Sequence, residues 1–402
     1  MVAGKWLVIS LGISLVAVVL TNTDSMSYEV SEHKTINEYI LDKSVGGFDF
    51  DQHVKQCLGI DGGMDDKCIS SLNILNWMTF VEYKSPKELI ARGGVKEDIP
   101  FFRSMRHFHD PLQDWNNAGL HDNHDSSILW AQYPKGKQSL SILNGGNYSW
   151  HDAREYFHAA LTGGDMEHRN TALRNTFLAV GHLMHLIQDS SVPEHVRDDS
   201  HIFGCQYERL VENYHKEYIQ TFENWLVGNY KENETIKSRY TYDESVLRMT
   251  PNELAPVPIA RIVDTEQYRE GKNPSDTVAK PIGLAEYTNA NFFSSGTIFS
   301  DYTYPNYESS VQEAACDISN PRDETGIIKR LYLKKVADGE TGYNLCLVSI
   351  LWDGAFFNQG VIPDLLKVNS LDDHVLVGYA ERLVPRAVSY SAGLLKYFFR
   401  GT

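Results

Sequence analysis

The segment from His182 to His195 places four candidate metal ligands within fourteen residues. His185 and Asp189 are four positions apart, so on a helix their side chains lie on one face and can bind a single ion. Pro193 ends that helix, because it lacks a backbone donor and disfavours helical angles in the residue before it. The turn then brings His195 back toward the same face. The apolar residues upstream recur at steps of four and three, the pattern of an amphipathic helix packed on a core: Leu173, Phe177, Val180, Met184 and Ile187.

Further donors follow this turn as far as Glu208. On a helix alone, two histidines and an aspartate are more often hydrogen-bonded surface groups than ligands, and it is the continuation that favours a metal site. The mixture of imidazole and carboxylate suits zinc, which binds these groups at about 2.0 to 2.2 Å. The segment from His185 to His195, with Tyr207 and Glu208 after it, resembles the core signature of zinc-dependent phospholipase C, a family related in fold to the S1/P1 nucleases.

A second part of the resemblance lies upstream. The family has an aspartate followed by a His-Phe-aromatic-Asp-Pro motif, and both supply ligands to the metal that the helix histidine binds. Asp98 and His107 occupy these positions, with Glu97 as an alternative to Asp98. His109 stands where an aromatic residue is usual, and we interpret it as a packing or supporting residue. His182 shares the ligand face of the helix without a counterpart among the family ligands, so a supporting role is expected for it.

The amino end predicts processing. Residues 1–27 combine one early basic residue with an apolar run, which fits a secretory signal peptide. The apolar run is shorter than the roughly 20 residues of a membrane-spanning helix. Cleavage after Ser25-Met26-Ser27 would leave Tyr28 as the first residue, and a secreted or periplasmic protein is expected. The resemblance then implies that the amine and carbonyl of Tyr28 bind zinc together with His33, although the family has tryptophan at this position.

The resemblance implies up to three zinc ions. The first ion would be bound by four side chains: Asp98, His107, His185 and Asp189. The second would share Asp189 with two amino-terminal ligands: Tyr28 and His33. The third would be bound by the last three donors: His195, His201 and Glu208. Asp98 is in addition the expected catalytic base, which accepts the proton of the attacking water.

The third zinc site departs from the family spacing. His201 and Glu208 are seven residues apart, against four in the family, and Gly204 between them predicts a loop that leads into a helix. Cys205 is an alternative ligand, because a thiolate binds zinc well. An extracytoplasmic location favours disulfides instead, with Cys57–Cys68 and Cys316–Cys346 as expected pairs and Cys205 left free, although sequence alone leaves the connectivity open.

Clustered zinc ions indicate phosphate-ester hydrolysis, because they lower the pKa of a bound water and stabilise the charge of an in-line displacement. We favour a phospholipase C that releases diacylglycerol and a phosphorylated head group. A single-strand nuclease of the S1/P1 type is the alternative, since the five-residue spacing from Tyr28 to His33 is nuclease-like. A non-catalytic, zinc-stabilised protein that binds lipid or phosphate is the third hypothesis, and the altered spacing before Glu208 favours it.

The charge of the chain bears on its partners. The formal net charge is −16, and no basic stripe is present for duplex nucleic acid. An acidic surface also disfavours anionic membranes, while transient contact with other membrane surfaces stays open. The sequence gives no sign of an obligate protein partner.

The fold is predicted to be mainly α, a multi-helix bundle of the phospholipase C/P1 nuclease type, in one domain over residues 28–402. Helical patterns cover residues 35–41, 151–189, 207–230 and 372–400. A polar insertion is expected at about residues 231–350, since its first part is rich in proline. Within it, residues 327–336 and 343–350 are rich in β-branched and aromatic residues and flank a Gly-containing turn, which predicts a β-hairpin.

Overall fold

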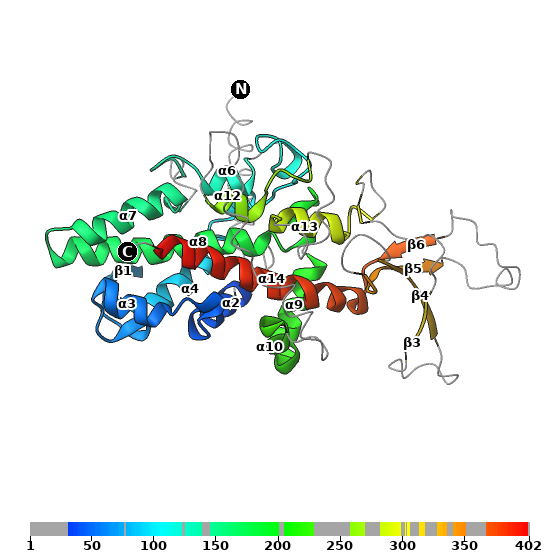
Figure 1. The fold of residues 1–402 in the computed structure, drawn as a ribbon, viewed down its shortest axis with the longest axis horizontal. Coiled ribbons are helices and arrows are strands. Elements are labelled where there is room, and N and C mark those ends of the chain that lie inside the picture. The colour runs from blue at the N-terminus through cyan, green and yellow to red at the C-terminus, as the bar shows by residue number, and fades with distance from the viewer. Residues whose placement is uncertain are drawn as a thin grey trace, which may run out of the picture.

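The structure of the chain is a computed structural model, which describes residues 31–75, 78–122, 125–138, 145–200, 205–228, 258–269, 282–298, 302, 304–305, 313–317, 328–335, 341–350 and 367–400. Over these ranges the protein is mainly helical (Figure 1). The helices are α2 (Ser31–Asp42), α3 (Phe50–Leu58), α4 (Pro86–Lys96), α5 (Phe101–Ser104), α6 (Ser127–Ala131), α7 (Trp150–Thr162), α8 (Met166–Asp189), α9 (Gln206–Glu217), α10 (Ile219–Val227), α12 (Pro258–Val263), α13 (Leu284–Asn291) and α14 (Asp373–Phe399). The strands are β1 (Ile69–Leu75), β2 (Met78–Lys84), β3 (Glu313–Asp317), β4 (Ile328–Lys334), β5 (Asn344–Ile350) and β6 (Lys367–Ser370).

Helix α8 is the central element of the fold. It packs against α4, α7 and α14, and Figure 1 shows it along the middle of the helical part. Every residue from Thr176 to Asp189 is buried. A helix that is enclosed on all sides must pair the polar groups that it carries. The histidines and the aspartate of its last turns therefore need partners from neighbouring elements.

Two of the predicted helical stretches are each divided into two helices. The helical pattern over residues 151–189 forms two helices, α7 and α8, which the Gly163-Gly164 turn separates. Glycine ends a helix readily because, without a Cβ atom, it adopts non-helical backbone angles at little steric cost. The side chain of Asp165 then accepts a hydrogen bond from His168 N and caps the start of α8. Residues 207–230 likewise divide into α9 and α10 at Tyr218.

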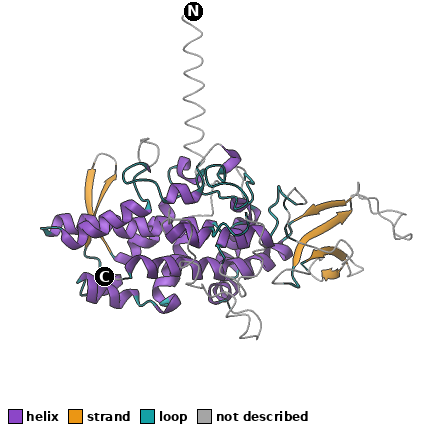
Figure 2. Cartoon of the chain, turned by 45° about the horizontal axis from the view of Figure 1, so that its top comes forward, coloured by secondary structure: helices purple, strands orange, loops and turns teal. Residues whose placement is uncertain are grey.

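The strands form two antiparallel sheets. β1 and β2 form a hairpin that the sequence analysis missed, and β3, β4, β5 and β6 form a four-stranded sheet in that order. The predicted hairpin is confirmed as the β4–β5 pair, with Leu333 opposite Cys346. Figure 2 shows the four-stranded sheet projecting from one end of the helical part. In contrast, α12 and α13, which fall within the predicted polar insertion, are largely buried and contact α14.

The two expected disulfides are absent. Cys57, Cys68, Cys205 and Cys346 all carry free thiols. Cys57 is exposed on α3, whereas Cys68 packs against the core. Cys316 and Cys346 lie on β3 and β5, on opposite sides of β4. Two strand spacings amount to roughly 10 Å, which exceeds the Cα separation of about 7 Å that a disulfide tolerates.

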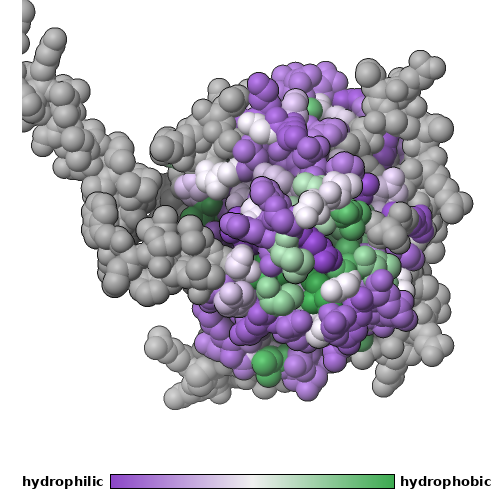
Figure 3. All heavy atoms as spheres, turned by 90° about the vertical axis from the view of Figure 1, so that its left-hand side faces the viewer, coloured by the Kyte–Doolittle hydropathy of each residue, from purple (hydrophilic) through white to green (hydrophobic). Residues whose placement is uncertain are grey.

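The face at the α7–α8 turn is mostly hydrophilic, with apolar side chains gathered near its middle (Figure 3). Leu161 and Met166, on either side of that turn, are 50% and 64% exposed. Among the residues that the structure describes, no helix is long and apolar enough to cross a membrane. The predicted signal peptide, residues 1–27, lies outside the described residues.

Substituting Gly181 tests the close packing of α4 against α8. A Cβ atom added at Gly181 would lie 2.1 Å from Ile90 O and 2.8 Å from Gly93 Cα. We expect Gly181→Ala to lower the free energy of unfolding by about 1–3 kcal/mol or more, because two backbones must move apart. Gly378→Ala on α14 is the matched control, since nothing lies within 4 Å of its added Cβ, and it should raise that free energy by up to about 1 kcal/mol. Equal urea midpoints for the two variants would contradict the expected close contact.

Candidate metal centre

Four separate parts of the chain meet at the end of α8. His33 comes from α2, Asp98 from the segment just after α4, and His107 from the loop after α5. α8 contributes His185 and Asp189 from its last two turns. All five residues are buried. The predicted ligands of the first ion, together with His33 of the second, are therefore brought to one place.

The carboxylate of Asp189 is the centre of the group. Its Oδ2 atom lies 2.7 Å from His107 Nδ1 and 3.0 Å from His185 Nε2. Asp98 Oδ1 lies 3.5 Å from each of the same two ring nitrogens. The donor atoms of Asp98, His107 and His185 all lie within 4.8 Å of one another, a separation that one metal ion can span.

The other oxygen of Asp189 faces a second group. Asp189 Oδ1 lies 3.4 Å from His33 Nε2, and the His33 ring stacks on His185 with 3.7 Å between centroids. Donor atoms of His33, His185 and Asp189 form a second set within 4.8 Å. Asp189 thus presents one oxygen to each set, as a carboxylate that bridges two ions does. Tyr28, the predicted partner of His33, lies outside the described residues.

Hydrogen bonds fix the orientation of two imidazoles. His185 Nδ1 lies 2.7 Å from Gly94 O, and His33 Nδ1 lies 2.7 Å from Gln188 Oε1. With a proton on each Nδ1, these nitrogens donate, and each Nε2 is the ring nitrogen that faces the carboxylates. Histidine ligands of metals are usually held in this way by an acceptor on the far nitrogen. The role of Gln188 was missed in the sequence, although it is the neighbour of Asp189.

The third predicted site is described in part. His195 lies between two acids: its Nδ1 is 3.6 Å from Asp189 Oδ2, and its Nε2 is 3.5 Å from Glu208 Oε1. Glu208 lies in the first turn of α9, which confirms the helix start expected after Gly204. His201 lies outside the described residues. Burial and the carboxyl groups of Glu194 and Glu208 raise the pKa of the Cys205 thiol well above its usual value, which disfavours the alternative of a thiolate ligand.

The centre holds an excess of buried acid. Burial lowers the pKa of His185, but Asp189 and Asp98 outweigh it and raise that pKa to about 10. Burial together with Asp189 and Glu194 raises the pKa of Glu208 well above its usual value. Buried charges of one sign are costly unless a counter-charge is present. The donor set fits a divalent cation, which would replace the proton that His185 holds.

Glu97, the alternative to Asp98, points to different partners. Arg103 donates to Glu97 Oε2 from Nε at 3.1 Å and from Nη2 at 2.5 Å, and Trp130 Nε1 donates to Oε1 at 2.7 Å. His182 Nδ1 also contacts Oε2, and Tyr148 stacks on the His182 ring at 3.9 Å. His107 Nε2 lies 3.8 Å from Glu97 Oε1. Glu97 thus lies between His107 and His182, and the contact of His182 with Glu97 is the position in which a supporting residue would lie.

His109 has a partner that the sequence analysis did not find. Its Nε2 atom lies 3.0 Å from Oδ2 of the buried Asp264, which follows α12. The two residues are 155 positions apart in the chain, so no local pattern indicated the pair. The contact with Asp264 is polar, so a supporting role for His109 would rest on a hydrogen bond and not on aromatic packing alone.

Comparisons with known proteins add no relative. No protein-family model matches the chain, and no curated protein or solved structure shows significant similarity to it. The residues of the centre and the spacing of the motifs are therefore the observations that bear on function.

The pH dependence of stability tests the environment of His182. Burial lowers its pKa to about 4, although Glu97 opposes the shift, while the unfolded chain has a value of about 6.5. The unfolded chain then binds the proton more readily, so the free energy of unfolding should fall as pH falls from about 6.5 to about 4. In metal-free protein, His182→Gln should remove up to about 1.4 kcal/mol per pH unit of this slope, measured by urea unfolding. His151→Gln, at an exposed position on α7, should leave the slope unchanged, and a wild-type slope in His182→Gln would refute the assignment.

Proposed function

We propose that this protein is a secreted zinc-dependent phosphodiester hydrolase, and that it acts as a phospholipase C, with the fold of the phospholipase C and P1 nuclease superfamily. The observation that carries the proposal is the position of Asp189, whose Oδ1 faces the imidazole of His33 and whose Oδ2 faces those of His107 and His185. The mainly helical architecture around α8 is consistent with that fold.

The ligand set supports zinc. Asp98, His107, His185 and Asp189 would hold one ion, and Asp189 with His33 would hold a second ion together with the amino terminus of the processed chain. His195 and Glu208 would hold a third with His201. Imidazole and carboxylate are ligands that zinc prefers. When bound, zinc lowers the pKa of a coordinated water toward about 7 and offsets the charge of a phosphodiester.

Asp98 is the residue that we propose as the catalytic base. Its side chain is only 4% exposed, and its Oδ1 atom lies 3.5 Å from both His107 Nδ1 and His185 Nε2. A carboxylate at this distance from the ligand nitrogens can bind metal with one oxygen and accept a proton with the other. Glu97, held by Arg103, His182 and Trp130, keeps the backbone before Asp98 in place.

The surroundings of Asp98 favour a lipid as substrate. Ile99 follows it directly and is 58% exposed, and Phe102 is 46% exposed. Apolar side chains in water beside a metal centre fit acyl chains better than a sugar–phosphate backbone. The net charge of −16 also weakens nucleic-acid binding. Cleavage between glycerol and phosphate would release diacylglycerol and a phosphorylated head group.

Replacing Asp98 tests the chemistry. We expect Asp98→Asn to lower kcat on phosphatidylcholine by about 10²- to 10⁴-fold, because the amide accepts no proton from water. Asp114→Asn is the matched control on an exposed side chain nearby, and its kcat should equal that of the wild type. Released phosphocholine is measured against time, with single-stranded DNA as the second substrate.

The outcomes of this assay separate the three hypotheses. Hydrolysis of DNA in preference to lipid would favour the nuclease. Zinc-loaded wild type that hydrolyses neither substrate would favour the non-catalytic protein. Wild-type activity in Asp98→Asn would show that the base is a different residue.

Metal removal tests the ligand set itself. Zinc added to chelator-treated wild type should raise the free energy of unfolding by about 2.7 kcal/mol at a free concentration one hundred times the Kd. Asp189→Asn should lose most of this gain, because the variant removes the charge shared by both ligand sets. Asp165→Asn is the control at the other end of α8; its side-chain oxygen can still cap the helix, and the variant should keep the gain from zinc. An equal gain in all three proteins would exclude Asp189 as a ligand.

A further inference from the structure

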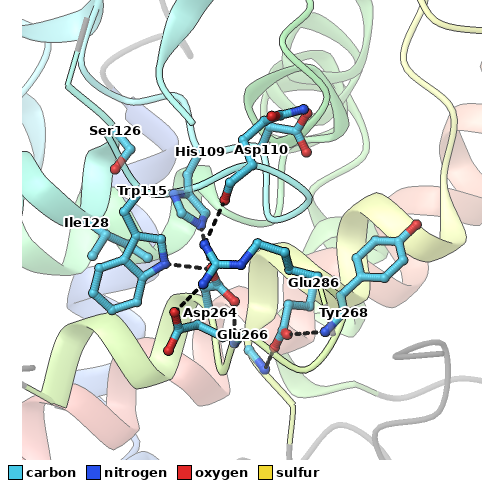
Figure 4. A network of polar contacts seen from close by, with 12 residues as sticks. His109, Asp110, Trp115, Ser126, Ile128, Asp264, Glu266, Tyr268 and Glu286 are labelled. Atoms are coloured by element: carbon cyan, nitrogen blue, oxygen red, sulfur yellow. Dashed lines mark hydrogen bonds and ion pairs between the residues drawn. The ribbon is translucent and has the colours of Figure 1, made fainter. Parts of the chain in front are cut away.

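A buried polar contact joins the loop of His107 to the segment after α12. His109 Nε2 lies 3.0 Å from Asp264 Oδ2, and Trp115 Nε1 donates to the same oxygen at 2.8 Å. Figure 4 shows His109 and Trp115 converging on Asp264. Both His109 and Asp264 are 1% exposed. A buried carboxylate at full charge needs such donors, since each one lost leaves a costly orphan acceptor.

The same residue links two loops that carry ligands. The backbone N–H of His109 donates to His195 O at 2.8 Å. His109 is two residues from His107 in the chain, and His195 is itself a candidate ligand. The side chain of His109 is thus anchored on Asp264 while its backbone joins the two loops. A shift of His109 would move both candidate ligands.

Asp264 is itself held in place by hydrogen bonds. Asp264 N donates to Ala260 O at 2.7 Å, and Asp264 Oδ1 accepts from Glu266 N at 2.6 Å. Glu286 of α13 then accepts hydrogen bonds from Thr265 N and Tyr268 N, each at 2.9 Å (Figure 4). The segment after α12 is therefore held by hydrogen bonds on both sides of Asp264.

A second contact acts in the same direction. Asn289 of α13 donates to Asp110 Oδ1 at 3.4 Å and to Val196 O at 2.6 Å. Asp110 follows His109, and Val196 follows His195. Elements from the second half of the chain thus hold the same two loops at two points.

We propose that His109 is a positioning residue for the metal centre: its hydrogen bond to Asp264 sets the places of His107 and His195 and thereby the affinity for the bound ions. The proposal rests on the metal-binding function proposed above. Ligand positions must be held within about 0.5 Å for tight binding, and outer partners of ligands typically contribute 10- to 100-fold in affinity. The charge of Asp264 agrees with this role: burial raises the pKa of Asp264, but His109, the backbone N–H of Glu266 and Trp115 together outweigh burial and lower that pKa.

Three variants test the proposal. His109→Phe keeps an aromatic ring but removes the donor, His109→Gln keeps a donor, and Asp264→Asn keeps the shape but removes the charge. Asp372→Asn is the matched control, because Asp372 also accepts from one aromatic side chain and one backbone N–H, Tyr332 Oη and Val375 N. Zinc affinity is measured by competition with a chelator, and cobalt(II) substitution reports ligand geometry through its visible absorption. Urea unfolding of the metal-free proteins measures stability separately.

We expect His109→Phe and Asp264→Asn to lose about 10- to 100-fold in zinc affinity and to change the cobalt spectrum. His109→Gln should retain most of the affinity, and Asp372→Asn should lose stability alone. Wild-type affinity in His109→Phe and Asp264→Asn, or equal losses in the Phe and Gln variants, would overturn the positioning role while leaving the proposed function intact. A wild-type protein that binds neither zinc nor cobalt would overturn both proposals.

Discussion

The burial of the Asp189 carboxylate is the constraint on which the rest of the structure depends. Asp189 lies at the end of the buried stretch of α8 from Thr176 onward, so its charge cannot be hydrated and must be met by other groups. Its partners come from α2, from the loop after α5, from α8 itself and from the turn after it. Each of these elements is therefore tied to one point.

Close packing of α4 on α8 supports the same point. Gly93 and Gly181 have no side chains, so the two backbones approach closely enough that an added Cβ would meet backbone atoms. This approach brings Gly94 O within 2.7 Å of His185 Nδ1, where it can accept the proton of the ring. The absence of side chains at Gly93 and Gly181 thus determines which nitrogen of His185 faces Asp189. Stability and ligand geometry share one cause here.

Local pattern was enough to predict part of this arrangement. The spacing of His185 and Asp189, and the stop at Pro193, follow from helix geometry, and the β4–β5 hairpin follows from its turn. The grouping of Asp98 and His107 with them rested on motif resemblance, since 78 residues separate His107 from His185. The partners of Glu97 and His109 could not be read, because His182 is 85 residues from Glu97 and Asp264 is 155 from His109. The boundary between α7 and α8 at Gly163-Gly164 was not predicted, although two adjacent glycines are a common sign of a helix end.

The balance of charge in the centre is the physical reason for proposing a metal ion there. Asp98, Asp189 and Glu208 are buried acids within one group, and protonated imidazoles would be the usual counter-charges. Burial and the neighbouring His185 lower the pKa of His33 to about 3, so His33 carries no charge near neutral pH. One proton on His185 then faces more than one carboxylate. A divalent cation supplies two charges without a second proton on any ring, and it uses the nitrogens that the hydrogen bonds to Gly94 and Gln188 already turn inward.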